Sequence, residues 1–273
     1  MNFFTPAEVV ENYGIVGRNK TEMPVFKMLI LGILSGMFIA FGAAATNTAG
    51  HSISDVSTMR TIVALLFPGG LTLVMLMGGE LFTGNCLISI SVLEKKAGLC
   101  GMVKNLAVVY LGNLTGSLLI AFSCAKFGQM NYSDGGLAVF TMRLAAAKST
   151  LPFSNAFVLG LLCNMLVCFA VLAGLSAKDT VGKVAGLFFP ICFFVLSGFE
   201  HSVANMYYIP AGIFAASVPE YAARAAEAGV NLSVLTWGNF FFKNLLPVTL
   251  GNMAGGLMVG CSMWLAYRWK QKK

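Results

Sequence analysis

The chain has 273 residues, of which 57% are hydrophobic and only 11% are charged, and its mean hydropathy is +0.78. A soluble domain has about a quarter of its residues charged, so this composition excludes a soluble protein and indicates an integral membrane protein. The net charge of +7 does not imply a nucleic-acid partner, because its distribution along the chain follows the rules of membrane topology.

The first 24 residues carry charges of both signs and no apolar stretch, so they are unlike a signal peptide. Residues 1–24 are interpreted as a cytoplasmic, amphipathic segment. Within it, residues 3–20 are expected to form a helix on the inner face of the membrane.

Six apolar runs follow, and together they predict an all-α membrane protein. The second and fifth runs are long and contain glycine-rich interruptions, so each is interpreted as half-helix, loop, half-helix. The predicted spans lie near residues 25–48, 60–92, 101–126, 154–175, 183–217 and 239–267.

Two segments between the spans are predicted to be polar outer loops, at residues 127–150 and 218–236. In the second of these, Glu220, Arg224 and Glu227 stand at helical spacing, which predicts a short surface helix.

The two interruptions match each other. Residues 78–85 read Gly-Gly-Glu-Leu-Phe-Thr-Gly-Asn, and residues 198–205 read Gly-Phe-Glu-His-Ser-Val-Ala-Asn. A shift of 120 residues aligns Gly, Glu and Asn at three places. Broken helices at corresponding points of two halves indicate a pathway between those halves.

The repeat extends beyond the interruptions. Residues 31–34 (Leu-Gly-Ile-Leu) match residues 159–162, and residues 111–116 match residues 250–255. Each half, about 25–126 and 154–267, therefore has three spans. Because three is odd, the two halves enter the membrane from opposite sides, which makes the repeat inverted. Small residues one turn apart allow close helix packing; they are Gly32, Gly36, Gly112, Gly116, Gly251 and Gly255.

Basic residues set the orientation. Segments 1–27, 94–104, 176–183 and 268–273 hold twelve of the eighteen Lys and Arg residues. Placing them all in the cytoplasm gives six spans with both termini inside. We expect a single channel domain at residues 25–268 and a cytoplasmic tail at residues 269–273, in the cytoplasmic (inner) membrane of a bacterium.

The seven cysteines form no Cys-x-x-Cys pair, and most lie in apolar stretches. They predict small core residues rather than a disulfide framework or a zinc site. Two histidines with scattered cysteines do not supply a metal or haem site. No cofactor, no metal and no enzyme activity are expected.

Ionisable residues at membrane depth are costly and therefore become functional candidates. Glu80 and Glu200 occupy equivalent places at the two interruptions. A carboxylate there can accept the backbone N–H groups that a broken helix leaves without partners. We expect this supporting role, shared with Asn85 and Asn205; direct contact with a permeant species is the alternative.

His201 is the single histidine predicted inside the membrane, and it stands in the second interruption. A buried core histidine is the ordinary alternative, but its position favours a role in the pathway. Asn164 in the preceding span is expected to hold its tautomer through a hydrogen bond. His51, in an outer loop, is expected to be solvated.

Lys148 precedes the fourth span and allows two interpretations, a side chain that reaches the membrane interface or a source of positive potential for anions. Large apolar residues near the interruptions also allow two interpretations: they are plain core residues, or they form a constriction that strips water from a permeant solute. They are Phe67, Leu71, Leu81, Phe82, Val167 and Phe194.

The interruption motifs, with Asn164 and with Leu-Gly-Asn at residues 250–252, make the chain resemble the formate/nitrite transporter family over essentially its whole length. The resemblance implies an aquaporin-like protomer with its own pore, in a homopentamer. It implies that Thr83 and His201 face each other across the pore centre, with Asn164 bonding the histidine. It further implies that Lys148 draws anions inward and that the six apolar side chains form two slits.

The expected function is a channel for small monovalent weak-acid anions, with formate first; residues 205–210 look closer to formate channels than to nitrite channels. Nitrite and hydrosulfide are the alternative substrates. A neutral-solute channel of the aquaporin type is the other class, but its Asn-Pro-Ala motifs are missing because the chain contains no Asn-Pro.

The proposed mechanism follows from the cost of moving a bare charge through an apolar slit. Formic acid has a pKa of about 4, like a side-chain carboxyl, and loss of water raises it. A proton from solvent or through His201 then allows the neutral acid to pass. Passage of the anion itself, with His201 charged, is the competing mechanism.

Overall fold

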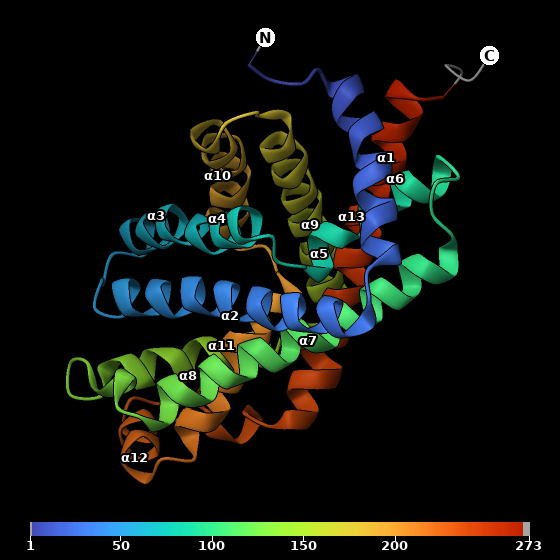
Figure 1. Cartoon of the computed structure of the whole chain (residues 1–273). Helices are drawn as coiled ribbons and strands as arrows, with labels where there is room; N and C mark the ends of the chain where they lie inside the picture. The colour runs from blue at the N-terminus through green and yellow to red at the C-terminus, as the bar shows by residue number, and fades with distance from the viewer. Residues whose placement is uncertain (1, 270–273) are drawn as a thin grey trace.

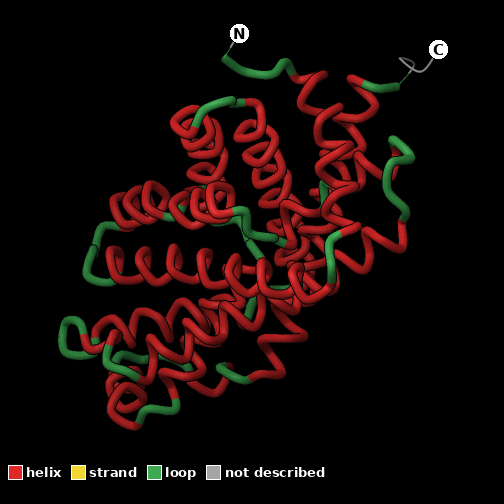
Figure 2. The backbone as a smooth tube through the Cα atoms, viewed as in Figure 1, coloured by secondary structure: helices red, strands yellow, loops and turns green. Residues whose placement is uncertain are grey.

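A computed structural model describes residues 2–269 of the chain, so the predicted cytoplasmic tail, residues 269–273, lies outside the described residues except for Trp269. Within that part every regular element is a helix (Figure 2), and an isolated antiparallel bridge joins Phe3 to Ala177. The elements, in chain order, are α1 (Pro6–Glu22), α2 (Val25–Gly50), α3 (Val56–Leu66), α4 (Pro68–Met77), α5 (Phe82–Asn85), α6 (Ile88–Leu93), α7 (Leu99–Lys126), η1 (Gln129–Asn131), α8 (Gly136–Ser149), α9 (Phe153–Ser176), α10 (Thr180–Leu196), α11 (Ser202–Ala216), α12 (Pro219–Glu227), η2 (Leu232–Val234), η3 (Asn239–Leu245, a π-helix) and α13 (Leu246–Tyr267).

Five of the described helical segments are long and apolar enough to cross a membrane. They are Val25–Gly50, Val56–Met77, Leu99–Lys126, Phe153–Ser176 and Asn239–Tyr267, and the shorter apolar segments Phe82–Leu93 and Thr180–Leu196 stand beside them.

Both predicted interruptions occur. Helix α4 ends at Gly78 and helix α10 is followed by Gly198, and these two glycines have φ angles of 72° and 71°. That left-handed backbone favours glycine, which has no Cβ to collide with its own carbonyl. The chain then runs without helix to Leu81 and to His201, where α5 and α11 begin.

Two helix pairs cross with their backbones in close contact, α2 with α7 and α9 with α13. A methyl group added to Gly116 would collide with the carbonyl oxygen of Ile33, and one added to Gly255 would collide with that of Leu161. Lipid provides no hydrophobic drive for helix association, so small residues that permit close packing hold such pairs together. The small-residue prediction is confirmed at these crossings.

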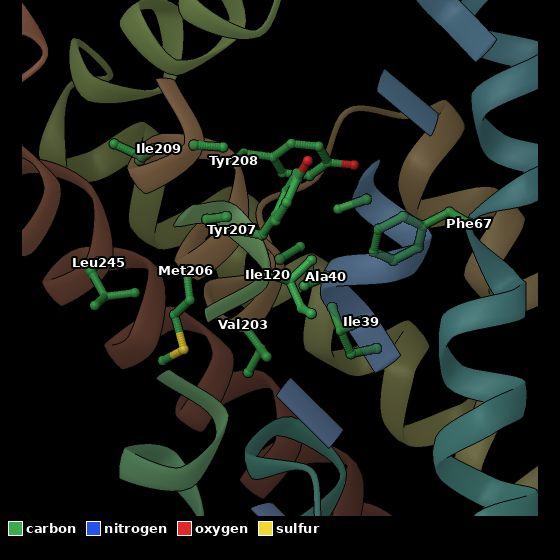
Figure 3. Close-up of a cluster of buried hydrophobic side chains, with 14 of the residues drawn as sticks. Ile39, Ala40, Phe67, Ile120, Val203, Met206, Tyr207, Tyr208, Ile209 and Leu245 are labelled. Atoms are coloured by element: carbon green, nitrogen blue, oxygen red, sulfur yellow. The ribbon is translucent and has the colours of Figure 1, made fainter. Parts of the chain in front are cut away.

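Helix α11 forms the middle of the core. Figure 3 shows Val203, Met206 and Tyr207 of this helix among the side chains of Ile39 and Ile120, which belong to α2 and α7. All five side chains are at least 93% buried. Most residues of α11 are buried in this way, so protein rather than lipid surrounds this helix.

Helix α1 packs against the rest of the protein through one side. A capping box starts it, since Thr5 Oγ1 accepts from Glu8 N and the Glu8 carboxylate accepts from Thr5 N. Val9, Val10 and Tyr13 are buried, and Ser91 Oγ on α6 donates to the Tyr13 carbonyl at 3.1 Å. The predicted helix exists, but its apolar side is covered by the rest of the chain.

The start of α1 and the end of α13 lie at the same end of the molecule (Figure 1). Arg268 joins them, because its guanidinium lies 3.3 Å from Glu11 Oε2 and 3.3 Å from Glu94 Oε1. The side chain of Glu94 is 1% exposed and also accepts from Trp264 Nε1 at 2.8 Å. This buried carboxylate therefore fixes α1 and α13 beside α6.

The prediction that residues 127–150 form a polar outer loop is wrong. Residues Gly136–Ser149 form helix α8, which packs against α11 and buries Leu137, Met142 and Ala145. Ala145 meets Gly212 of α11 so closely that a methyl group at Gly212 would collide with it. The short alanine side chain allows this contact, and the 14-residue helix is too short to be recognised as a membrane span. The predicted surface helix of the other segment is confirmed as α12.

Candidate functional site

Asn113 of α7 satisfies the backbone groups of the first interruption. Its Oδ1 accepts from Phe82 N at 2.9 Å, and its Nδ2 donates to Gly32 O at 2.8 Å and to Glu80 O at 2.9 Å. An amide side chain suits this place because the broken helix leaves both N–H and C=O groups without partners.

Asn252 of α13 does the same for the second interruption. Its Oδ1 accepts from Ser202 N at 2.9 Å, and its Nδ2 donates to Gly160 O at 2.7 Å and to Glu200 O at 3.0 Å.

The prediction that the Glu80 and Glu200 carboxylates accept backbone N–H groups of the breaks is wrong. Among the described residues, those carboxylates bind side chains instead.

Glu200 belongs to a closed ring of four residues. Its Oε1 accepts from Lys148 Nζ at 2.7 Å and its Oε2 accepts from Asn205 Nδ2 at 2.6 Å. Asn205 Nδ2 also donates to Asn244 Oδ1 at 2.8 Å, and Asn244 Nδ2 donates to the carbonyl of Lys148 at 2.9 Å. The ring holds both the ammonium and the backbone of the lysine.

Glu80 belongs to an equivalent ring. Its Oε1 accepts from Lys20 Nζ at 2.5 Å, and its Oε2 accepts from Asn85 Nδ2 at 2.7 Å. Asn85 Nδ2 donates to Asn105 Oδ1 at 2.8 Å, and Asn105 Nδ2 donates to the carbonyl of Lys20 at 3.1 Å. Each buried carboxylate is therefore paired and fully hydrogen-bonded, as a charge at this depth requires.

The asparagines of these rings have a sequence signal that the interruption motifs alone do not reveal. Residues 104–106 and 243–245 both read Lys-Asn-Leu, and 139 residues separate Asn105 from Asn244, as they separate Asn113 from Asn252. Lys20 and Lys148 are 128 residues apart, as are residues 31–34 and 159–162, so the repeat extends to α1 and α8, just outside the predicted halves.

Thr83 and His201 meet between the two rings. Thr83 Oγ1 lies 2.9 Å from His201 Nε2, and His201 Nδ1 accepts from Ala204 N at 3.1 Å. Because Nδ1 accepts a backbone N–H, the neutral ring carries its proton on Nε2 and donates it toward Thr83. His201 is 3% exposed and Thr83 is fully buried.

Asn164 lies beside this pair but does not bond the histidine, so the predicted Asn164–His201 hydrogen bond is wrong. Its Nδ2 donates to the carbonyl of Thr83 at 3.2 Å and to the carbonyl of Asn252 at 2.6 Å. The two ring nitrogens of His201 instead contact Thr83 Oγ1 and the Ala204 N–H. Asn164 therefore positions Thr83 rather than His201.

A cavity of about 290 Å³, named here the Lys148 vestibule, opens on one side of the centre. Lys148, Glu200 and His201 line it together with Phe67 and Phe194. The rings of Phe67 and Phe194 meet edge to face with centroids 5.7 Å apart, and Phe194 lies 5.9 Å from the His201 ring. Two of the predicted constriction residues thus flank the histidine.

A second cavity of about 190 Å³, the Lys20 vestibule, lies on the other side. Lys20 and Glu80 line it with Leu71 and Leu81, which are two more of the predicted constriction residues. Tyr13 of α1 also lines it and donates its hydroxyl to Gly84 O at 3.3 Å. Helix α1 therefore supplies part of this wall.

The remaining predicted constriction residues lie elsewhere. Phe82 packs edge to face on Tyr110, with centroids 4.8 Å apart, and lines an apolar groove between α7 and α13. Val167 of α9 is 2% exposed. Neither residue lines the two vestibules.

His51 is not simply solvated, as the sequence predicted. Its Nδ1 donates to Thr48 O at 2.7 Å, and its Nε2 lies 2.8 Å from Ser133 Oγ, so it joins α2 to the segment before α8. Within residues 2–269, no three His, Cys, Asp or Glu side chains gather where they could hold a metal ion.

The sequence and the structure of this chain are similar to those of known proteins. The sequence profile of the formate/nitrite transporter family matches residues 7–265. A probable formate transporter of Methanothermobacter thermautotrophicus is 35% identical, over 97% of this chain and 98% of that protein. The formate channel FocA of Escherichia coli K12 is 35% identical, over 96% and 92%. A solved structure described as a pentameric formate channel with formate bound has a TM-score of 0.78 and 36% identity, over 89% of this chain and 97% of that one.

Proposed function

Because this chain belongs to the formate/nitrite transporter family, whose members are membrane transport channels and not enzymes, we propose that it is a channel for small monovalent weak acids. The observation that carries the proposal is the Thr83–His201 contact, a single polar pair between two cavities that each hold a Lys–Glu pair. A solute crossing from one cavity to the other would have to pass this pair.

Formate is the proposed main substrate. The relatives described above are named for formate, and one of the similar structures is described with formate bound. A cavity of about 290 Å³ has room for a small acid with several waters, each of which occupies about 30 Å³. Nitrite and hydrosulfide have the same charge and similar size, so they are the alternative substrates.

The electrostatics of the site favour an approaching anion without trapping it. Lys148 and Lys20 are each neutralised by a carboxylate in their rings, so neither lysine presents an unpaired charge to its vestibule. His201 is the N-cap of α11, and the N-terminus of a helix carries partial positive charge. Attraction of this moderate strength suits a channel, because a solute that binds too tightly does not leave.

We infer that the acid crosses the centre in its neutral form and takes its proton from solvent in the vestibule. A bare anion between Phe67 and Phe194 would lose its water without gaining a counter-charge. Relay of a proton through His201 requires a proton on Nδ1. That proton would point at the N–H of Ala204 and break the hydrogen bond from Ala204 N to Nδ1. The same contact, together with the helix N-terminus, disfavours a charged histidine.

His201 then acts as a neutral hydrogen-bond donor. Its Nε2–H, held toward Thr83 at 2.9 Å, can donate to the carbonyl oxygen of the passing acid, and Thr83 Oγ1 can accept from its hydroxyl. The pair would replace the water that the acid leaves behind in the constrictions formed by Phe67 with Phe194 and by Leu71 with Leu81.

The proposal extends to the assembly. The two equivalent rings and asparagine contacts support an aquaporin-like inverted repeat of six spans within one channel domain, residues 25–268, with halves near 25–126 and 154–267. The solved neighbour described as pentameric supports a homopentamer. Positive-inside counting places α1 and the Lys20 vestibule on the cytoplasmic side of the membrane. The proposed membrane is the inner membrane of a bacterium.

The test is a flux panel in proteoliposomes with formate, acetate, lactate, nitrite and hydrosulfide, each at two pH values. We expect formate to cross fastest among the carboxylates and faster at the lower pH. His201→Asn, which keeps a donor, should retain the pH dependence at reduced flux, and His201→Phe should nearly abolish flux. Water-driven swelling without formate flux would instead indicate a neutral-solute channel.

A further inference from the structure

The two vestibules have equivalent rings but unequal charge. Arg60 of α3 lines the Lys148 vestibule together with Lys148 and Glu200. His201 also lines it, but its neutral ring adds no charge. The charged residues of the Lys20 vestibule are Lys20 and Glu80. The first cavity therefore has a formal charge of +1 and the second has none.

Arg60 differs from the two lysines in having no carboxylate partner among the described residues. Its Nη1 donates a long hydrogen bond to the carbonyl of Leu196, at 3.4 Å. A guanidinium has five N–H donors, so most of them remain available to solvent or to a ligand. The residue is exposed toward the cavity mouth rather than buried in the ring.

The backbone beneath Arg60 leaves room for it. A Cβ atom at Gly198 would lie 2.9 Å from Arg60 Nη1, and Gly198 has a φ of 71°. The glycine that follows α10 thus also allows the guanidinium to lie over the start of the second interruption, beside Phe199 and Glu200 of the same cavity wall.

We propose that Arg60 is a docking site for small carboxylates at the mouth of the Lys148 vestibule, and that it makes the channel asymmetric. The inference rests on the proposed channel function. Because a guanidinium binds both oxygens of a carboxylate through two parallel hydrogen bonds, the site favours formate over hydrosulfide, which has one acceptor atom. The Lys20 vestibule has no matching cation, so it does not concentrate carboxylates in this way.

A structural role is the competing explanation, since Arg60 also contacts the last turn of α10 through Leu196 O, where a cation is favourable. The two roles differ in their consequences. A cap on α10 would change stability and affect flux equally from both sides. A docking site would change half-saturating formate and maximal flux from the Lys148 side together, and would leave the half-saturating concentration from the Lys20 side unchanged.

The test measures half-saturating formate from each side, in proteoliposomes whose protein has one orientation. In Arg60→Gln we expect the value from the Lys148 side to rise about three- to fivefold, the size of an exposed ion pair, with the maximal flux from that side rising in proportion. The flux at low formate and the value from the Lys20 side should be unchanged. Arg60→Lys should restore the attraction for formate and hydrosulfide alike, without the preference for formate. Lys126→Gln, which removes a charge outside both vestibules, is the matched control.

The unaltered protein gives a second test that does not depend on the folding of a variant. Between about 0.01 M and 1 M of a non-permeant salt, the Debye length falls from about 30 Å to about 3 Å. Half-saturating formate from the Lys148 side should rise more steeply than from the Lys20 side. Equal salt dependence, or an equal change on both sides in Arg60→Gln, would overturn the inference. Absence of any formate flux in the unaltered protein would refute the proposed function instead.

Discussion

Replacement of Asn113 by leucine removes the side chain that satisfies the first interruption. Asn113 is fully buried and makes three hydrogen bonds, from Phe82 N and to the carbonyls of Gly32 and Glu80. Side-chain hydrogen bonds between membrane helices average about 0.6 kcal/mol and reach about 1.7 kcal/mol. Three of them predict a loss of about 2 to 5 kcal/mol in the free energy of unfolding. Leucine has a similar volume, so a cavity contributes little.

The repeat supplies a matched comparison. Asn252→Leu removes the same three kinds of bond and should lose the same amount, whereas Asn155→Leu at the exposed start of α9 should change stability by less than about 0.5 kcal/mol. Reversible unfolding in mixed micelles measures all three. A loss below about 1 kcal/mol in either buried variant, or a difference of more than about 2 kcal/mol between them, would refute the account of how the breaks are held.

Two further predictions concern packing and charge. Gly116→Ala should lower the thermal unfolding temperature strongly, because the methyl group meets a backbone carbonyl of α2, while Gly69→Ala has open space and should have little effect; similar temperatures for both would contradict the close crossing. Lys20→Met should cost about 3 kcal/mol by leaving the buried Glu80 carboxylate unpaired, and Lys20→Met with Glu80→Gln should recover much of that loss in the same unfolding assay. Additive losses in the double variant would show that the two residues are not coupled.

The broken helices could be predicted because their cause is local. A glycine pair or single glycine followed by a buried carboxylate is visible in the chain at residues 78–80 and 198–200, and the structure has a left-handed glycine at each. The close helix crossings were predictable for the same reason, since they require small residues at fixed spacing.

The hydrogen-bond partners were not predictable, because several polar side chains compete for each break. Asn113, rather than Glu80, accepts the Phe82 N–H across 31 residues, and nothing in the local sequence ranks one acceptor above the other. Lys20 reaches Glu80 across 60 residues from helix α1. Helix α8, which carries Lys148, was missed because its 14 residues are too few to cross a membrane and include two basic side chains.

The most direct test of the central claim counts protons against formate. Proteoliposomes that contain a pH-sensitive dye, with formate supplied outside at a fixed membrane potential, report both fluxes together. If the acid crosses Thr83 and His201 as a neutral molecule, one proton enters with each formate, and the rate does not respond to voltage. A voltage-dependent formate current without proton uptake would contradict the claim.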